Sequence, residues 1–259
     1  MPGFFVSDRG LPGGKLPCMI VLFTDFGLQD TYVGQLHAAI AQAAPGEPVI
    51  DLLHHVPNHD IRAGAYLLPA YARELPKGTV FVCVVDPGVG GARQPVILRA
   101  SGLWFVGPDN GLFQLLARRD TDHEAYTIDW RPQRLSPSFH GRDLFAPVGA
   151  MLARGELPPT SETDLINSAG SDWPDELPQV MMVDRFGNAI TGVRANSVSQ
   201  DAQITVHNTV LSRATTFSDV PVGHPFWYEN ANGLVEIAIN QGSASEGLSI
   251  QPGDSVFIS

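Results

Sequence analysis

The sequence predicts an α/β fold in two parts. The first is a Rossmann-like N-terminal domain with a mostly parallel sheet flanked by helices, and the second is a small, barrel-like, all-β C-terminal domain. Short β-rich runs alternate with helical patterns up to residue 155, which is typical of βαβ units. The run TVFVCVVD at residues 79–86 is apolar without alternation, as expected for a parallel strand covered on both faces. Beyond residue 178 only short strand patterns follow, separated by Gly, Asn and Ser turns.

The N-terminal domain begins with two strands that are each followed by a helix. Pro45-Gly46 ends the first helical pattern, and Pro76-Lys77-Gly78 ends the second. Pro69 lies inside the second pattern and predicts a kink or an early stop, because proline lacks the amide hydrogen that a helix uses. Strands are predicted at residues 19–25, 48–54, 79–86, 94–100, 102–109 and 124–130, and helices at 32–44, 60–75, 110–119 and 143–155.

A polar stretch rich in Pro, Ser and Asp separates the two domains. We expect an N-terminal α/β domain at residues 19–160, a linker at 161–177 and a C-terminal β-barrel domain at 178–259. No helix is predicted within the C-terminal domain. Its strands are predicted at residues 179–188, 189–194, 202–211, 233–240 and 254–259.

The composition argues against several classes of function. A formal charge of −11 and a pI near 5.0 argue against a nucleic-acid groove, which needs a surplus of lysine and arginine. No apolar run approaches the roughly 20 residues that span a bilayer. The first 18 residues lack the basic start and long apolar stretch of a secretory signal. We therefore expect a cytoplasmic protein that binds a small molecule, and neither nucleic acid nor a membrane.

The cysteines and histidines give little support for a metal site. Cys18 lies in a Gly/Pro-rich leader and Cys83 in an apolar strand, so neither a disulfide framework nor a thiolate site is expected, and Cys83 is predicted to be a core residue. HHVPNHD at residues 54–60 resembles a metal cluster in composition. Its Pro57 turn and irregular spacing nevertheless favour a structural role over a metal site.

Acidic residues stand where three apolar strands stop. Asp25 follows MIVLFT, Asp86 follows TVFVCVV, and Asp109-Asn110 follows LWFVGP. Ligands of an open parallel sheet bind beyond the carboxyl ends of its strands. Each aspartate alone is equally compatible with a loop or helix cap, but three in one topology favour a binding site.

The loop DPGVGGAR and the segment SFHGRD carry further candidate residues. The glycines after Asp86 allow a sharp turn, so that Arg93 can return to pair with the carboxylate and keep it ionised. The alternative is a structural ion pair at a strand end. His140 stands in a glycine-containing loop directly before a helix, where a neutral imidazole can orient or deprotonate water. A structural histidine is the alternative.

Two nucleotide-binding interpretations fail on motif order and content. TDFG and HGRD together resemble kinase motifs, but they occur in the wrong order and without a glycine-rich nucleotide loop. DPGVGG lacks the lysine that a P-loop requires.

The C-terminal domain offers groups that suit a zwitterionic or heterocyclic ligand. VDRFGNAIT places Asp184, Phe186 and Asn188 in one short segment, which gives an acid, an aromatic face and an amide. A plain hairpin with Phe186 in the core is the alternative. Tyr228, Asn230 and Asn240 lie around another strand pattern, WYENANGLVEIAIN.

Taken together, six ordered motifs from Met19 to the C-terminus resemble the S-adenosylmethionine hydrolase family, the adenosylmethionine hydroxide adenosyltransferases, which are relatives of fluorinating and chlorinating enzymes. The leader, residues 1–18, falls outside the resemblance. The motifs are TDFGLQDTYVG, VDPGVGGAR, GPDNGLF, SFHGRDLFAPVGA, VDRFGNAIT and ENANGLVEIAIN.

The resemblance implies hydrolysis of S-adenosyl-L-methionine to adenosine and L-methionine, by metal-free attack of water or hydroxide on the ribose C5′, with no cofactor. The implied catalytic residues are Asp86, Arg93 and His140. The implied substrate-binding residues are Asp25, His59, Asp184, Phe186, Asn188, Tyr228, Asn230, Ala231 and Asn240.

The resemblance also assigns roles within this set. It places Asp25 on the ribose hydroxyls, Asp184 on the methionine ammonium, and Asn188 with Phe186 at the adenine, while residues 230–231 close on the methionine end. It further implies a homotrimer in which each site lies between the α/β domain of one chain and the β domain of its neighbour.

His59 occupies a position where the halogenating relatives carry tryptophan. Two other functions stay open at this stage. A halogenase is disfavoured because the charge of Asp86 opposes halide binding. A sensor that binds adenosylmethionine without turnover would have no need of Asp86, Arg93 and His140 together.

Overall fold

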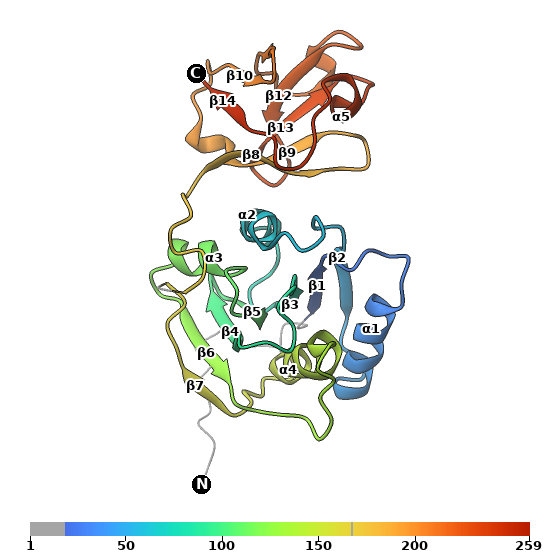
Figure 1. Ribbon diagram of the computed structural model, residues 1–259, viewed down its shortest axis with the longest axis vertical. Coiled ribbons are helices and arrows are strands. Elements are labelled where there is room, and N and C mark those ends of the chain that lie inside the picture. The colour runs from blue at the N-terminus through green and yellow to red at the C-terminus, as the bar shows by residue number, and fades with distance from the viewer. Residues whose placement is uncertain (1–18, 167) are drawn as a thin grey trace, which may run out of the picture.

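The N-terminal domain is built on a seven-stranded sheet in the order β2-β1-β3-β5-β4-β6-β7. The computed structural model describes residues 19–166 and 168–259 (Figure 1). Strands β2, β1, β3 and β5 are parallel neighbours, and β4, β6 and β7 extend the sheet antiparallel. The strands are β1 (Ile20–Thr24), β2 (Val49–Leu53), β3 (Val80–Val84), β4 (Pro95–Ala100), β5 (Leu103–Pro108), β6 (Glu124–Ile128) and β7 (Thr160–Glu162).

Helices cover both faces of this sheet, as the unbroken apolar strands predict. The helices are α1 (Tyr32–Ala43), α2 (Ile61–Ala72), α3 (Gln114–Arg119) and α4 (Ala146–Ala153). In β3, Phe81 and Cys83 pack into one core with α2 and α3, whereas Val80 and Val82 pack into the other with α1 and α4. Cys83 is fully buried, so its predicted core position is confirmed. Cys18 lies outside the described residues.

The C-terminal domain consists of two antiparallel sheets around a separate apolar core. Their strand orders are β12-β13-β9-β8 and β11-β10-β14. The strands are β8 (Leu177–Val183), β9 (Ala189–Arg194), β10 (Ile204–Val206), β11 (Thr209–Leu211), β12 (Pro225–Glu229), β13 (Leu234–Ile239) and β14 (Val256–Ile258). The four-residue helix α5 (Ala244–Gly247), capped by the Ser243 hydroxyl, is a short addition that the strand pattern did not predict.

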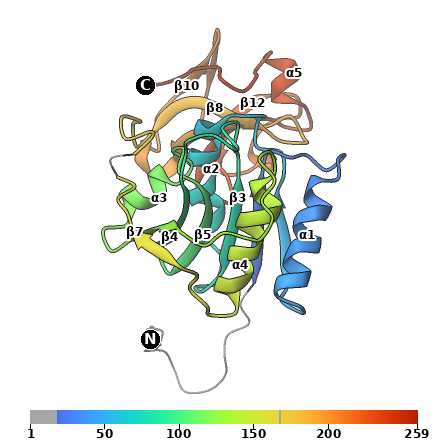
Figure 2. The same ribbon diagram turned by 60° about the horizontal axis from the view of Figure 1, so that its bottom comes forward.

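Helix α2 joins the two domains. It lies between the N-terminal sheet and the C-terminal domain in both views (Figure 1; Figure 2) and packs against β8 and β9. Leu177, Met182 and Leu234 of the C-terminal domain belong to the same apolar core as α2. The Tyr66 hydroxyl of α2 donates a hydrogen bond to the Pro174 carbonyl. One face of the C-terminal sheet is therefore buried against α2.

Three local features differ from the sequence patterns. Helix α2 continues past Pro69 and ends at Ala72, three residues before the end of the pattern at residue 75. A π-helical turn, Gly141–Phe145, precedes α4. Residues 161 and 162, expected in the linker, belong to β7, which pairs with β6 although its sequence TSE has no apolar pattern. No helix among the described residues is long and apolar enough to cross a membrane.

Candidate active site

The Asp86 carboxylate and the Arg93 guanidinium form a desolvated ion pair at the carboxyl end of β3. Arg93 Nη2 lies 2.5 Å from Asp86 Oδ2, and Arg93 Nε lies 3.0 Å from Asp86 Oδ1. The two side chains are 3% and 10% exposed, for Asp86 and Arg93 respectively. The guanidinium also lies over the Phe145 ring, 5.4 Å from its centroid. A paired, two-pronged contact of this kind fixes the orientation of both side chains.

The glycine loop brings this pair against the segment that carries His140. Gly90 has a φ of +77°, and a Cβ atom there would lie 2.3 Å from the Pro137 carbonyl oxygen. Only glycine accepts both the left-handed backbone and this close approach. The loop after Asp86 therefore packs directly on the chain that leads into the π-helical turn.

His140 completes a cluster of three residues from three segments. Its Nδ1 lies 2.8 Å from Arg93 Nη2. Because a guanidinium only donates hydrogen bonds, Nδ1 acts as the acceptor, and a neutral ring then carries its proton on Nε2. Burial, and secondarily the positive charge of Arg93, lower the pKa of His140. The ring is therefore neutral near pH 7 and presents an N–H donor on its free edge.

Asp25 lies in the same site, at the end of the neighbouring strand β1. Its Oδ2 accepts a hydrogen bond of 2.9 Å from the backbone N–H of His59. Burial raises the pKa of Asp25, and electrostatic repulsion from the negative charge of Asp86 raises it further. His59 has a φ of +65°, and its side chain is 78% exposed. The backbone of His59 thus holds Asp25 while its ring stays open to solvent.

The third predicted strand end has a different role. The Asn110 amide donates to the carbonyl of Val85, directly before Asp86. Burial raises the pKa of Asp109, whose partner is Ser168 rather than a member of the cluster. Asn110 therefore braces the backbone at Asp86.

A residue of the histidine-rich segment, His54, belongs to a chain of hydrogen bonds that ends at Thr24, directly before Asp25. The two ring nitrogens of His54 contact Thr24 Oγ1 at 2.8 Å and Asp51 Oδ1 at 3.0 Å, and Asp51 also contacts His37. His54 is buried. Among the described residues, no group of three or more His, Cys, Asp or Glu side chains is arranged to hold a metal ion. These hydrogen bonds fix Thr24, the residue before Asp25. In the sequence, the only sign of this arrangement was the high histidine content of the segment.

The first C-terminal group lies on the turn between β8 and β9. Asp184 Oδ1 accepts hydrogen bonds from the backbone N–H groups of Phe186 and Asn188, at 2.9 Å and 2.8 Å. Asn188 is buried, and its Oδ1 has no hydrogen-bond partner. The Phe186 ring is 76% exposed, which excludes the core position that the plain hairpin interpretation gave it. The turn thus carries an acid and an exposed aromatic ring, with a buried, unpartnered amide oxygen beside them.

The second C-terminal group lies around β12 and β13, and its amide side chains are engaged within the domain. Asn230 Nδ2 donates to Glu236, and its Oδ1 accepts two backbone N–H groups. Asn240 donates to the Val220 carbonyl. Tyr228 donates to Glu236.

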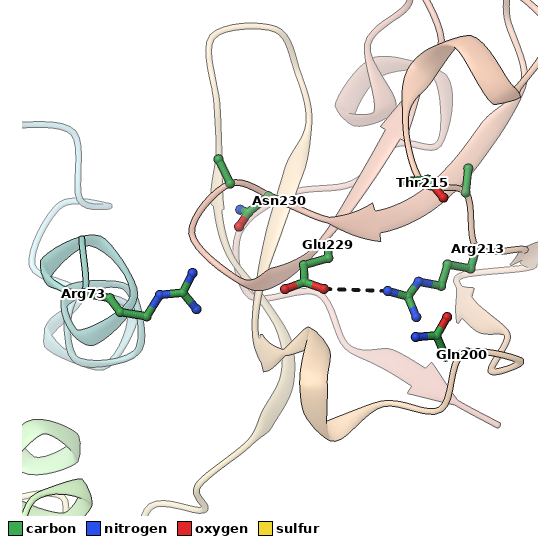
Figure 3. A pocket seen from close by; sticks show the side chains of 8 residues that line it. Arg73, Gln200, Arg213, Thr215, Glu229 and Asn230 are labelled. Carbon is green, nitrogen blue, oxygen red and sulfur yellow. Dashed lines mark ion pairs between the residues drawn. The ribbon is translucent and has the colours of Figure 1, made fainter.

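The exposed Ala231 and the adjoining Asn230 line a cavity of about 520 Å³ (Figure 3). Arg73, directly after α2, reaches towards it from the N-terminal domain, opposite the ion pair of Glu229 with Arg213.

The predicted residues therefore form one N-terminal and two C-terminal groups. Asp25, Asp86, Arg93 and His140 come together at the edge of the N-terminal sheet, and Asp184 with Asn188 lies on the turn between β8 and β9. Among the described residues, no hydrogen bond or ion pair joins the N-terminal group to the Asp184 turn within one chain.

Comparison with protein families gives two matches that together span both domains. Residues 20–162 match the SAM hydroxide adenosyltransferase N-terminal domain, and residues 178–257 match the SAM hydroxide adenosyltransferase C-terminal domain. SAM denotes S-adenosyl-L-methionine. The matched ranges leave out the segment that joins β7 to β8.

Several relatives and solved structures are similar over most of the chain. An (R)-S-adenosyl-L-methionine hydrolase from Thermus thermophilus is 39% identical, covering 90% of this chain and 96% of the relative. A relative of the same name from Salinispora arenicola is 38% identical, covering 91% and 95%. A fluorinase from Nocardia brasiliensis is 26% identical over 55% of this chain and 56% of its own. The crystal structure of a conserved, uncharacterised Thermotoga maritima protein superposes with a TM-score of 0.81 at 31% identity, covering 93% of this chain and 100% of that one.

The contact between Arg93 and His140 generates a testable prediction. Replacing Arg93 by Met removes a positive charge that lowers the pKa of His140 and leaves Asp86 unpaired beside it. Both changes favour the imidazolium, so the pKa of His140 is expected to rise. An NMR titration of the ring in a folded Arg93→Met variant measures it, with the exposed Arg99→Met as the control. A pKa that stays constant or falls would show that the contact does not govern this ring.

Proposed function

We propose, since the chain belongs to the SAM hydroxide adenosyltransferase family, that it hydrolyses SAM to adenosine and L-methionine. The observation that carries the proposal is the cluster of Asp86, Arg93 and His140, in which the Arg93 guanidinium contacts both other side chains. The curated relatives that share most of this chain bear the name of that activity.

The proposed reaction is a displacement at the ribose C5′. A lone pair of water forms the C5′–O bond while the C5′–S electron pair passes to sulfur, so methionine leaves as a neutral thioether. The positive charge of the sulfonium disappears in this step, which a poorly hydrated site favours. The leaving group is already activated by its charge and needs no Lewis acid, so the proposed reaction uses no metal or cofactor.

The cluster is suited to orient the attacking water. The Asp86 carboxylate keeps lone pairs beyond those that Arg93 occupies and can accept a proton from the water. The Nε2–H of His140 can donate to the water oxygen, which leaves the other lone pair for C5′. Arg93 holds both partners, so orientation supplies a large part of the rate enhancement. The proton passes towards Asp86 as the C–O bond forms, and then to solvent.

The remaining residues are proposed to bind the substrate. Asp25 receives the ribose hydroxyls beside Asp86. The carboxylate of Asp184 binds the methionine ammonium, and Asn188 lies at the adenine while the exposed Phe186 ring covers the base. The exposed ring of His59 lies beside the adenosyl portion.

The side chains of the second C-terminal group are already hydrogen-bonded within the domain, so their proposed contribution differs. We propose that Asn230 and Ala231 contact the methionine end through their backbone. Tyr228 and Asn240 are proposed to shape the same rim.

A homotrimer with sites between subunits fits the two separate half-sites. Exposed apolar side chains flank both halves: Leu28 and Tyr32 follow Asp25 and are 61% and 46% exposed, and Phe186 is 76% exposed. Bare apolar groups beside polar site residues are typical of an interface or a ligand site. In the proposed trimer, the β domain of a neighbouring chain closes over the edge of the N-terminal sheet.

One prediction of the proposed function concerns the cluster of Asp86, Arg93 and His140. Asp86→Ala and His140→Ala variants are expected to lower adenosine formation at least about hundredfold, because general acid–base and orienting groups contribute that much or more. The dissociation constant for SAM is expected to stay within about threefold. His123→Ala serves as the control, because His123 bonds only to its own loop. Products are identified by chromatography with and without chloride and a chelator.

Unchanged rates in both cluster variants would remove the catalytic assignment. A 5′-halo-adenosine formed with chloride would place the protein with the halogenases, and tight binding without any product would favour a sensor.

Another prediction concerns the assembly of the chains into the proposed trimer. Asp86→Ala and Asp184→Ala chains are each expected to be inactive, whereas co-assembled mixtures should regain about a quarter of wild-type activity, because a quarter of random interfaces combine two intact halves. The measurement is adenosine formation after the two variants are unfolded and refolded together. Wild-type protein taken through the same cycle is the control. No recovery, with trimers present, would show that each site is formed within one chain.

A further inference from the structure

A buried acidic residue lies on the face of the C-terminal sheet that packs on α2. Glu236 stands in the middle of β13 and is only 5% exposed. Side chains of a strand alternate between its faces, so Glu236 shares its face with Leu234, which belongs to the apolar core around α2. Its cross-strand partner Ile190 belongs to the same core. A carboxylate thus occupies a position whose neighbours are apolar, where an apolar side chain would be expected.

On one side, Glu236 holds the turn between β12 and β13. The Tyr228 hydroxyl donates to Glu236 Oε1 at 2.5 Å, and Asn230 Nδ2 donates to Oε2 at 2.9 Å. Asn230 Oδ1 in turn accepts the backbone N–H groups of Asn232 and Leu234, each at 3.0 Å. The Asn230 side chain therefore links the Glu236 carboxylate to the turn that contains Ala231 through hydrogen bonds on both sides.

On the other side, Glu236 lies close to the turn between β8 and β9. Glu236 pairs across the sheet with Ile190, two residues after Asn188, so it lies at the end of β9 nearest this turn. Burial raises the pKa of Glu236, the charge of Asp184 raises it further, and the Asn188 side chain lowers it. Asn188 is itself bonded to Asp184 through its backbone N–H and, at 3.3 Å, through Nδ2. The negative charges of Glu236 and Asp184 also raise the pKa of Tyr71 on α2. The carboxylate thus reaches both turns that carry candidate substrate-binding residues.

The arrangement is costly for stability, which favours a functional reason for it. Burial is the largest influence on Glu236 and raises its pKa. Replacing a buried polar group and its partners by apolar groups of similar shape is often neutral or stabilising. The surrounding core of Leu234, Ile190 and Met182 would accept such a replacement.

We propose that Glu236 is a positioning residue for substrate binding, which braces the turn carrying Asp184 and Asn188 against the turn carrying Asn230 and Ala231. The inference rests on the proposed function, because these two turns bind SAM only if the protein acts on SAM. Glu236 contacts no reacting atom. Its effect is to fix the spacing between the groups that receive the adenine and the methionine portion.

Three variants test the proposal. Glu236→Leu removes both acceptors. Glu236→Gln can keep both contacts, because its oxygen can accept from Asn230 while its amide donates to the Tyr228 oxygen. The control is Glu124→Gln on β6, since Glu124 likewise accepts from a tyrosine hydroxyl, that of Tyr126, but is exposed and lies on the N-terminal sheet. Melting temperature, kcat and KM for SAM are measured for each, on protein shown to be folded at the assay temperature.

We expect Glu236→Leu to raise KM about tenfold, the effect of losing one well-formed hydrogen bond, with kcat within about threefold of wild type. Glu236→Gln should stay within about threefold of wild type in both constants, and Glu124→Gln should match wild type. The split between KM and kcat separates positioning from simple loss of folded protein, which would lower kcat and leave KM unchanged.

The proposal is overturned if Glu236→Leu keeps the wild-type KM, if its loss of activity only follows the unfolded fraction, or if Glu236→Gln is impaired as severely as Glu236→Leu. Wild-type turnover decides the proposed function separately. A wild-type protein that forms no adenosine would refute that function, whereas an active wild type with an unaffected leucine variant would refute only the role of Glu236.

Discussion

The guanidinium of Arg93 is the contact on which the candidate active site depends. It holds the Asp86 carboxylate through two nitrogens and the His140 ring through one of them, while its face rests on Phe145. A desolvated carboxylate beside Asp25 would be costly without this partner. The glycine loop, the π-helical turn and the end of β3 can be understood as the backbone needed to bring these side chains together.

The second constraint is the division of the candidate residues between two domains. Helix α2 fills the space between the N-terminal sheet and the C-terminal sheet of the same chain, and its apolar contacts fix their relation. The cluster of Asp86, Arg93 and His140 and the turn that carries Asp184 therefore lie on different domains of one chain. Glu236 lies on the face of the C-terminal sheet that packs on α2, next to Leu234 and Ile190. The proposed trimer would bring the two together from neighbouring chains.

Much of the fold and of the N-terminal half-site could be predicted from the sequence, because their signals are local. Apolar strands that stop at Asp25 and Asp86 and a glycine loop that returns Arg93 are visible in the order of residues alone. The contact with His140 joins segments 47 residues apart, and the geometry confirms that the three side chains meet.

The remaining features depend on packing that no local pattern reveals. Glu236 is the one polar residue in the apolar run LVEIAI of β13, and its partners lie on other segments that the local sequence does not reveal. Asn230 and Asn240 look like free amides, yet their side chains are hydrogen-bonded within the domain. Strand β7 has no apolar pattern and is ordered by its backbone bonds to β6. The burial of His54 between Thr24 and Asp51 likewise depends on strand pairing.

The most direct test of the account is the fate of the water oxygen. The purified protein is incubated with SAM in water enriched in ¹⁸O, and the products are analysed by mass spectrometry. Attack on C5′ predicts one ¹⁸O atom in the 5′-hydroxyl group of adenosine and none in methionine. Formation of 5′-methylthioadenosine together with a labelled amino-acid product would place the attack on the other side of the sulfonium and contradict the account.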